Sequence, residues 1–538
     1  MVPYKNVGDL LLKRVDEHEE KPFLIFYDDD GHRREYTYRE FFEEVCKAAR
    51  YLAASGIGVG DRIAIVSHNQ AETVIQYFAG LLVGTAIVPV NLGEDDRRIS
   101  YVLENSGAKL AFVRDQYIQR ISRLVPPLPL QLVETGDHTH KKLPHFATEI
   151  AKHAPTLPEI PAVQIDDDAL IVYTSGTTGH PKGVILSQYN LLVDAMAIAE
   201  WHQFTDDQRM MCVLPLHHVN GIVVTLMTPL YAGSGVVLNQ RFHPDKFFER
   251  IAAERASIVS VVPTLLQFLL HSRLDMETYK LKDFRHIICG AGPLTVELAQ
   301  KFEQTFKIPI MHGYGLSETT CYSCFLPIDL TVAEHKGWMT KHGFPSIGVP
   351  LPVNDMAIHD PTGSALPEGE RGEIVVRGHN VMKYYYQDPA ANEETFANGW
   401  FRSGDEGFYL TDDQSRMFFF ITGRMKELII RGGANISPFE IDEVLMHVPG
   451  AEAAIAVGFE NDWYGEEVGA FVKPKAGREI SAEQVLTYCR KFLPYSKSPK
   501  VVVFGSDIPI TSTGKYQRNK LKALFEEWKT TQFTEKQR

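Results

Sequence analysis

Short apolar runs alternate with helical patterns over the first third of the chain. Residues 62–67, 85–90 and 109–113 are rich in apolar and β-branched side chains, which is typical of buried strands. The stretches 71–84 and 99–105 between them have apolar residues at helical spacing and predict helices. This alternation favours a mostly parallel sheet with helices on its faces.

Residues 124–166 interrupt this alternation. They contain few long apolar periods and are rich in proline, with Pro126, Pro127, Pro129, Pro144, Pro155, Pro158 and Pro161. We interpret the segment as a connector rather than core. The alternation then resumes, with strands predicted at 211–214, 235–238, 257–262 and 286–289 and helices at 244–253 and 295–306. Two α/β sheet layers in one large domain follow from this pattern.

Short strands and turns replace this pattern from about residue 348. The runs GEIVVRG, GFYLTDD and RMFFFITG predict a small β-rich subdomain over 348–425, the last part of an N-terminal domain that spans 1–425. Residues 426–538 show helical patterns near 438–447 and 482–492 and strand patterns near 453–458, 468–473 and 501–505. The predicted fold class is therefore α/β, with a separate α+β C-terminal domain.

The composition excludes several classes of protein. The 55 Lys and Arg residues against 68 Asp and Glu give a net charge of −13, which argues against a nucleic acid as partner. A chain that is 44% hydrophobic and 23% charged is typical of a globular protein. The first 20 residues lack an apolar signal-peptide core, and no apolar stretch reaches the ~18 residues of a membrane span. We expect a soluble cytoplasmic protein, either monomeric or homodimeric.

The six cysteines do not form a disulfide framework. Only Cys321 and Cys324 are close in sequence, and this C-x-x-C pair lacks both a second pair at zinc-site spacing and a nearby histidine. We therefore expect reduced thiols and no metal or redox role for them.

The segment 171–186, IVYTSGTTGHPKGVIL, contains the clearest chemistry. An apolar strand leads into a Gly, Ser and Thr turn that ends in Lys182. Glycines allow the backbone N–H groups to converge on an anion, while the hydroxyls add donors and Lys182 adds a positive charge. The spacing differs from that of the P-loop. A plain surface turn is the alternative, but the flanking strand and the lysine favour a phosphate site.

This segment resembles the phosphate-loop signature of the adenylate-forming superfamily, which includes acyl-CoA synthetases, peptide-synthetase adenylation domains and firefly luciferase. Four further segments match in order, namely HGYGLSET at 312–319, NGWFRSGDEG at 398–407, TGRMKE at 422–427 with its continuation, and TGKYQRNKL at 513–521. The resemblance covers essentially the whole chain. It implies ATP and Mg²⁺ as cofactors, coenzyme A as co-substrate, and a C-terminal domain that moves about a hinge at Lys426.

The resemblance assigns contacts with ATP or AMP to Thr174, Ser175, Gly176, Thr177, Thr178, Lys182, Gly290, Ala291, Gly292, His312, Gly313, Tyr314, Gly315, Ser317, Asp405 and Arg424. Asp405 is suited to accept hydrogen bonds from the ribose hydroxyls. Arg424 would reach the ribose or a phosphate, and Tyr314 offers a flat face for adenine. Glu318 is a hard oxygen ligand suited to Mg²⁺, and Ser317 would contact the α-phosphate. The alternatives are a surface turn for Asp405, an ordinary strand-end charge for Arg424 and a core aromatic for Tyr314.

Lys515 is the catalytic residue that the resemblance favours most. Adenylation brings a carboxylate and the α-phosphate together, and a fixed ammonium group lowers the repulsion between them. Lys426 matches the hinge, about which the domain would turn after adenylation. Arg431, Gly432 and Gly433 would then line the path of the coenzyme A thiol, although two glycines also suit a plain hairpin turn.

The acid-binding residues are less clear. His218 aligns with a pocket histidine of coenzyme A ligases, and Thr319 follows Glu318 in a small, mildly polar run. No basic residue stands out as a partner for a second carboxylate, so an aliphatic, fatty or aromatic monocarboxylic acid is the expected small-molecule substrate. The predicted function is an ATP-dependent carboxylate–CoA ligase. The alternative is a free-standing enzyme that loads the phosphopantetheine of a carrier protein. A nucleotide-binding protein without catalysis is disfavoured, because Lys182, Glu318 and Lys515 are all present.

Overall fold

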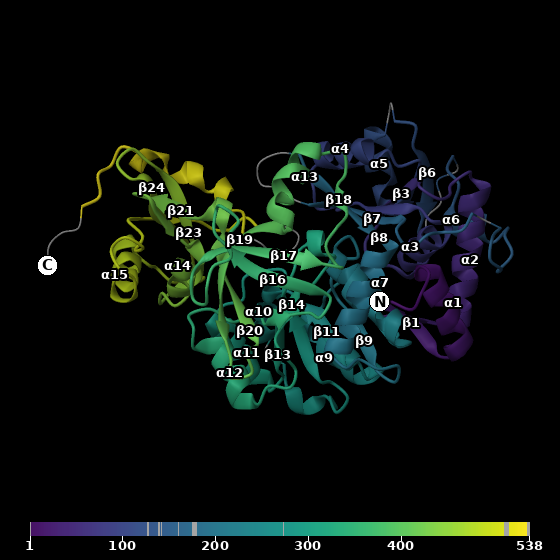
Figure 1. The fold of residues 1–538 in the computed structure, drawn as a ribbon, viewed down its shortest axis with the longest axis horizontal. Coiled ribbons are helices and arrows are strands. Elements are labelled where there is room, and N and C mark those ends of the chain that lie inside the picture. Colours follow the sequence, from purple (N-terminus) through teal and green to yellow (C-terminus); the bar gives the residue numbers. More distant parts are fainter. Residues whose placement is uncertain are drawn as a thin grey trace.

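Two large, mostly parallel sheets confirm the predicted α/β layering (Figure 1). The computed structural model describes residues 2–125, 128–137, 140, 142–159, 161–174, 180–272, 274–510 and 516–534. The first sheet has the order β18-β8-β7-β4-β3-β5-β6. Strand β8 runs antiparallel to both of its neighbours, β7 and β18. Its strands are β3 (Arg62–Val66), β4 (Ala86–Pro89), β5 (Leu110–Arg114), β6 (Gln131–Thr135), β7 (Asp168–Thr174), β8 (Lys182–Ser187) and β18 (Tyr384–Tyr385).

The second sheet has the order β15-β14-β13-β12-β11-β9-β10-β1-β2. Its strands are β1 (Pro22–Tyr27), β2 (Arg33–Thr37), β9 (Arg209–Cys212), β10 (Gly235–Asn239), β11 (Ile258–Val261), β12 (His286–Cys289), β13 (Ile310–Tyr314), β14 (Cys324–Phe325) and β15 (Val349–Pro350). Strands β1 and β9 to β13 are parallel, so their carboxyl ends meet at one edge. Ligands of open α/β sheets bind at that edge.

Helices cover the sheets. They are α1 (Val7–His18), α2 (Tyr38–Ala54), α3 (Ala71–Val83), α4 (Asp96–Ser106), α5 (Ile118–Leu124), α6 (Phe146–Ile150), α7 (Gln188–Trp201), α8 (Thr228–Ala232), α9 (Pro244–Glu254), α10 (Pro263–His271), α11 (Val296–Phe306), α12 (Val332–Thr340) and α13 (Pro389–Thr395), with a π-helical segment η2 (Asn220–Met227) before α8. Helix α2 begins in a capping box, in which Thr37 and Glu40 each accept a hydrogen bond from the other's backbone N–H. Nearly all of α3 is buried, as expected of a helix that is apolar on every side.

The interpretation of residues 124–166 as a connector is wrong in part. Strand β6 extends the first sheet beside β5, and α6 packs against it. Val133 and Phe146 are fully buried, and Phe146 contacts Phe112 at 5.2 Å between ring centroids. Both elements have only five residues and stand between prolines. The hydrophobic pattern of the segment therefore did not reveal them.

The β-rich subdomain and the C-terminal elements follow the predicted pattern. Strands β16 (Asn354–His359), β17 (Gly372–Gly378), β19 (Phe401–Thr411) and β20 (Met417–Arg424) form an antiparallel sheet. A five-stranded sheet of β21 (Ile429–Arg431), β22 (Ala434–Ile436), β23 (Ala451–Asn461), β24 (Gly465–Pro474) and β25 (Val501–Phe504) packs with α14 (Pro438–Leu445) and α15 (Ala482–Phe492). These C-terminal elements lie at the end of the molecule opposite α1 and α2 (Figure 1).

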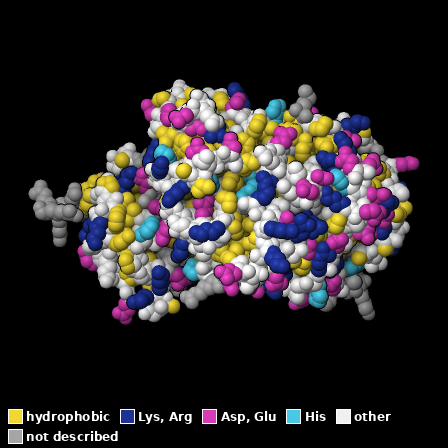
Figure 2. Space-filling model, turned by 90° about the horizontal axis from the view of Figure 1, so that it is seen from below, with side chains coloured by type: hydrophobic (Ala, Val, Ile, Leu, Met, Phe, Trp, Pro, Cys, Tyr) yellow, Lys and Arg dark blue, Asp and Glu magenta, His cyan; other side chains and the backbone are white. Residues whose placement is uncertain are grey.

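The surface carries charged side chains of both signs. Lys and Arg side chains are interspersed with Asp and Glu over the face drawn in Figure 2. No helix among the described residues is long and apolar enough to cross a membrane.

Cys321 and Cys324 are free and buried, and burial raises the pKa of both thiols, so both are protonated at neutral pH.

A buried pair of histidines gives a prediction for stability against pH. His286 Nε2 lies 3.0 Å from His202 Nδ1, and burial lowers both pKa values, that of His286 to about 3. In the unfolded chain both rings would take up protons below a pH of about 6.5. The contribution of both neutral rings to the free energy of unfolding is therefore present above that pH and is lost as the pH falls, by up to about 2 kcal/mol at pH 5 for His286. His202 acts in the same direction.

Thermal unfolding at pH 7.5, 6 and 5 checks this expectation. The control is a double variant, His202→Phe with His286→Leu, whose melting temperature should fall less steeply with acid. Equal slopes in the two proteins would contradict the assignment.

Candidate active site

The predicted nucleotide residues gather at the carboxyl ends of the central strands. Gly290, Ala291 and Gly292 follow β12, His312 to Tyr314 end β13, and Gly315 and Ser317 follow β13. Thr174 at the end of β7 pairs with Lys182 at the start of β8. The turn that they flank contains the predicted residues Ser175, Gly176, Thr177 and Thr178, which lie outside the described residues.

Tyr385 joins the phosphate segment to the predicted metal ligand. Its hydroxyl donates to Glu318 Oε1 at 2.8 Å, and Lys182 Nζ lies 4.8 Å from the centre of its ring. Burial, followed by the charge of Glu318, raises the pKa of Tyr385, so the hydroxyl keeps its proton. Sequence reasoning missed Tyr385, because β18 carries no motif and reaches this place only by pairing with β8.

Glu318 fits the coordination preference of Mg²⁺. Its half-buried carboxylate stands in a short 3-10 turn, η4 (Ser317–Thr319), directly after β13, and one oxygen is oriented by the Tyr385 hydroxyl. Mg²⁺ typically takes one or two carboxylates together with phosphate oxygens and water. A single oriented carboxylate fits this preference, with phosphate oxygens and water as the remaining ligands.

Asp405 forms a second polar group with Tyr314 and Arg424. The Tyr314 hydroxyl donates to Asp405 Oδ2 at 2.7 Å, and Arg424 Nε lies 3.2 Å from Asp405 Oδ1 across the β19–β20 pair. Asp405 is 1% exposed, so it is not a surface turn. Its charge is the main cause that raises the pKa of Arg424, and Glu318 contributes to the same shift. The two polar groups therefore share one electrostatic site.

Tyr314 holds Asp405, which gives a testable prediction. Replacing Tyr314 by phenylalanine is expected to raise the KM for ATP about tenfold or more, since hydrogen bonds to charged groups contribute about 1.5–3 kcal/mol. The measurement is ATP–pyrophosphate exchange at varied ATP. The matched control is Tyr409→Phe on β19, the strand of Asp405, where the Tyr409 ring packs against Phe419. An unchanged KM for ATP in Tyr314→Phe would contradict the assignment.

His312 is a buried, neutral ring in the same region. Its Nδ1 donates to the carbonyl of Ser346 at 2.8 Å, and burial lowers its pKa to about 4. Ala291 has φ of +61°, a strained conformation for a residue with a Cβ atom. His312 and Gly292 also line a cavity together with Phe439 and Tyr516 from the C-terminal part of the chain. The adenine side of the predicted site thus faces the C-terminal elements.

A buried polar network holds the turn that follows Glu318. Thr320 has φ of +63°, and its Oγ1 donates to the carbonyl of Asn380 at 2.6 Å. Asn380 Nδ2 donates to the carbonyl of Tyr322 at 2.8 Å and to Asp194 Oδ1 at 3.3 Å. A Cβ atom at Gly315 would lie 1.9 Å from the carbonyl oxygen of Cys321, so only glycine fits there. Asp194 and Asn380 carried no signal in the sequence.

The two predicted acid-binding residues differ in their surroundings. His218 precedes η2, and its ring lies 4.3 Å from that of His217. Burial lowers the pKa of His217 to about 4. Thr319 is fully buried, and its Oγ1 accepts a hydrogen bond from the backbone N–H of Leu316 at 3.0 Å. The Thr319 side chain therefore stabilises its own turn.

The predicted hinge and coenzyme A residues lie in the C-terminal part. Lys426 is exposed in a short 3-10 turn, η6 (Met425–Glu427). Gly432 and Gly433, with φ of +56° and +83°, form the two-residue turn between β21 and β22. Arg431 Nε donates to Glu467 at 2.7 Å, so its guanidinium is engaged within the C-terminal sheet.

Lys515 lies outside the described residues, but the chain on either side of it is well placed. Ile510 and Tyr516 pair as an isolated antiparallel bridge, and Gln517 N–H donates to the carbonyl of Pro509 at 2.8 Å. The described residues that flank Lys515 are thus paired with each other, and Tyr516 lines the cavity beside His312.

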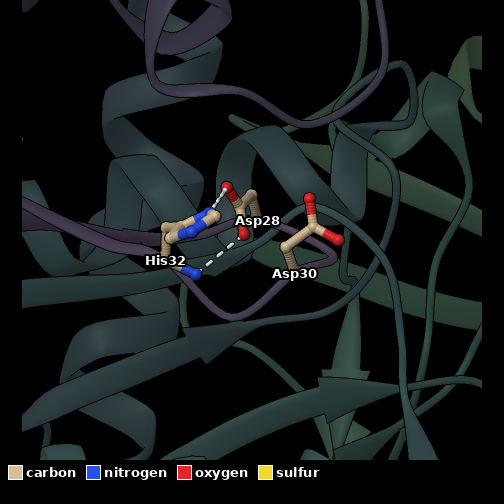
Figure 3. Close-up of side chains that lie close together, drawn as sticks. All are labelled: Asp28, Asp30 and His32. Atoms are coloured by element: carbon tan, nitrogen blue, oxygen red, sulfur yellow. Dashed lines mark hydrogen bonds and ion pairs between the residues drawn. The ribbon is translucent and has the colours of Figure 1, made fainter.

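One group of three potential metal ligands occurs elsewhere among the described residues. Asp28, Asp30 and His32 lie together in the turn between β1 and β2 (Figure 3). His32 Nδ1 lies 2.9 Å from Asp28 Oδ2, and both Asp30 and His32 are exposed. The histidine and one carboxylate satisfy each other, as is common in polar turns.

Comparisons with known proteins show the family of this chain. Residues 11–386 match the family model described as AMP-binding enzyme, and residues 440–515 match the AMP-binding enzyme C-terminal domain. The chain belongs to this family of adenylate-forming enzymes. It is 31% identical over 523 residues to a sulfoacetate–CoA ligase of Cupriavidus necator, covering 96% of this chain and 97% of that protein. It is also 31% identical to a feruloyl-CoA synthase of an Amycolatopsis species, covering 91% and 94%.

Solved structures give the same result. ATP-bound MatB from Rhodopseudomonas palustris superposes with a TM-score of 0.85 at 27% identity, covering 97% of this chain and 99% of that one. The o-succinylbenzoate CoA synthetase of Bacillus subtilis, in complex with an acyl-adenylate, superposes with a TM-score of 0.82 at 29% identity, covering 97% and 99%. The protein is accordingly an ATP-binding, AMP-forming acid–CoA ligase, as its sequence predicted.

Proposed function

We propose that the protein activates an aliphatic or aromatic monocarboxylic acid with ATP and Mg²⁺, releases pyrophosphate, and passes the acyl group to coenzyme A with release of AMP. The observation that carries this proposal is the contact of Tyr385 with both Lys182 and Glu318. It joins the base of a phosphate-binding turn to a carboxylate suited to Mg²⁺, at the carboxyl ends of parallel strands.

The first step forms the acyl-adenylate. Asp405, held by Tyr314 and Arg424, accepts the ribose hydroxyls, and Lys182 offsets the charge of the phosphates. Mg²⁺ held by Glu318 would neutralise charge on the leaving pyrophosphate. Lys515 would stabilise the charge that develops as the acid's carboxylate meets the α-phosphate. The cavity that contains Tyr516, Gly292 and His312 supports this placement of the Lys515 segment.

The second step transfers the acyl group. The C-terminal domain turns about Lys426, and the thiol of coenzyme A passes Gly432 and Gly433, which lack side chains that would obstruct it. Arg431 would have to exchange its contact with Glu467 for one with coenzyme A, since its guanidinium is engaged in the present arrangement.

The relatives support the type of reaction, but they do not identify the acid that this protein uses. Their names include ligases of sulfoacetate, feruloyl and long-chain fatty acids. Such variety at about 30% identity is expected, since the shared motifs serve the adenylate chemistry and the acid is recognised by other residues.

Pyrophosphate release from ATP and Mg²⁺, with a panel of short, medium, long and aromatic acids, tests this function. We expect release that turns over many times when coenzyme A is present. Release that stops near one equivalent of enzyme, even with coenzyme A, would contradict coenzyme A as the acceptor. A carrier protein with phosphopantetheine would then be the acceptor to test.

A further inference from the structure

Three neutral polar side chains from separate segments converge in the interior beside the candidate active site. Asn220 stands at the start of η2, Ser260 on β11, and Tyr322 in the turn after Glu318. Their exposed fractions are 6%, 0% and 2%. Asn220 Nδ2 donates to the Tyr322 hydroxyl at 3.2 Å, and Ser260 lies beside the same hydroxyl. We call this group the polar floor.

The polar floor has unused hydrogen-bonding capacity. Asn220 Oδ1 is buried and has no hydrogen-bond partner among the described residues, whereas Ser260 is hydrogen-bonded to the Tyr322 hydroxyl. A buried polar atom that stays unpaired costs about 1–3 kcal/mol, so such atoms in native proteins are usually matched by a protein group, water or ligand. The unpaired Asn220 oxygen, beside the Tyr322 hydroxyl, indicates a site for a hydrogen-bonding partner.

The polar floor lies under the predicted substrate residues. A Cβ atom at Gly290 would lie 2.6 Å from the Tyr322 hydroxyl, so the tyrosine reaches the turn assigned to adenine. Asn220 follows His218 by two positions, and Tyr322 follows Thr319 by three. The proposed function assigns these segments to the acid, which would bring the acid's chain beside the floor.

The chemistry of the floor restricts its partner. Burial raises the pKa of Tyr322, so its hydroxyl remains neutral. All three side chains are uncharged, and an uncompensated second carboxylate would be expensive to bury among them. The Tyr322 ring packs against Phe325 at 4.3 Å between centroids and occupies the space beyond Gly290. A neutral polar group on a short chain fits both restrictions.

We propose that Asn220, Ser260 and Tyr322 determine the specificity of the ligase, selecting short acids with a neutral hydroxyl or carbonyl group over alkyl acids of the same size. This inference rests on the proposed function, because it requires the acid to lie beside His218 and Thr319. A site built to hydrogen-bond a substrate hydroxyl discriminates strongly against an analogue that lacks it, because its own polar groups then stay unpaired.

Isosteric pairs of acids test the selection. The pairs are 3-hydroxybutyrate with 3-methylbutyrate and 4-hydroxybutyrate with pentanoate, each assayed by pyrophosphate release, and octanoate tests length. We expect kcat/KM for at least one hydroxy acid to exceed that of its methyl isostere about tenfold or more, with octanoate poorer still. Equal or inverted ratios, or a preference for octanoate, would overturn the inference and leave the ligase function intact.

Single substitutions test whether the polar floor causes the preference for hydroxy acids. Tyr322→Phe and Asn220→Leu should each reduce the ratio of hydroxy acid to isostere about tenfold, whereas Tyr51→Phe, a buried tyrosine on α2, should leave the ratio unchanged. A ratio that survives both floor variants would overturn the assignment. Absence of pyrophosphate release with every acid tested, in protein that still binds ATP, would overturn the proposed function itself.

Discussion

Replacing Lys515 by alanine is expected to lower the rate of acyl-adenylate formation about 10²–10³-fold, with little change in the KM for ATP. Two anions, the carboxylate and the α-phosphate, must approach within bonding distance, and the charge grows as the new bond forms. An ammonium fixed at that place acts more strongly on the transition state than on the separate substrates. Pyrophosphate exchange at saturating ATP and acid measures this half-reaction directly.

The control lies five residues further along the chain. Lys520 is exposed in a short 3-10 turn, Arg518–Lys520, and its replacement by alanine should leave the exchange rate unchanged. Thiol transfer from preformed acyl-adenylate should also survive in Lys515→Ala, because that step uses the other domain arrangement. A Lys515→Ala protein that exchanges pyrophosphate at the normal rate would refute the proposed role.

Much of the fold was predictable because many of its elements carry a clear hydrophobic pattern. Helix α15 spans the residues that its pattern predicted, and strands β3, β12 and β25 agree within a residue. Parallel strands buried on both faces give continuous apolar runs, which are visible in a single sequence. Strand β6 (QLVET) and helix α6 (FATEI) are just as short but lack a continuous apolar run, so neither a strand nor a helical period shows in the sequence.

Site residues that stand in a recognisable sequence motif could be predicted. Residues that reach the site only through the pairing of distant strands could not. Lys182, Glu318, Asp405 and Arg424 stand in ordered motifs, so their residue types could be matched directly. Tyr385 contacts Glu318 across 67 positions of sequence, because β18 pairs with β8. Tertiary pairing of this kind leaves no local signal.

A buried ion pair between Arg518 and Asp442 is expected to stabilise the C-terminal domain strongly. Arg518 is 4% exposed, and its Nη1 donates to Asp442 Oδ1 at 3.0 Å and to the carbonyl of Ala456 at 2.8 Å. Its Nη2 donates to the second oxygen of Asp442. Asp442 lies on α14 and Ala456 on β23, so Arg518 ties the chain after Lys515 to the core of the C-terminal domain.

Arg518→Leu is expected to destabilise the C-terminal domain by about 3–5 kcal/mol, because it leaves the Asp442 carboxylate buried without its cation. The double variant Arg518→Leu with Asp442→Leu should recover most of that loss, since a buried ion pair replaced by apolar side chains is often neutral. Denaturant unfolding and limited proteolysis of the C-terminal domain measure the effect.

The matched control is Arg490→Leu on α15, where the arginine side chain is 47% exposed and lies 3.6 Å from Glu483. Exposed ion pairs contribute about 0–1 kcal/mol, so this variant should unfold close to the unmodified protein. If Arg518→Leu unfolded like Arg490→Leu, the pair with Asp442 would not be what anchors the segment. The expected order, in which the single variant is far less stable than the double, separates the cost of an orphaned carboxylate from the loss of the arginine itself.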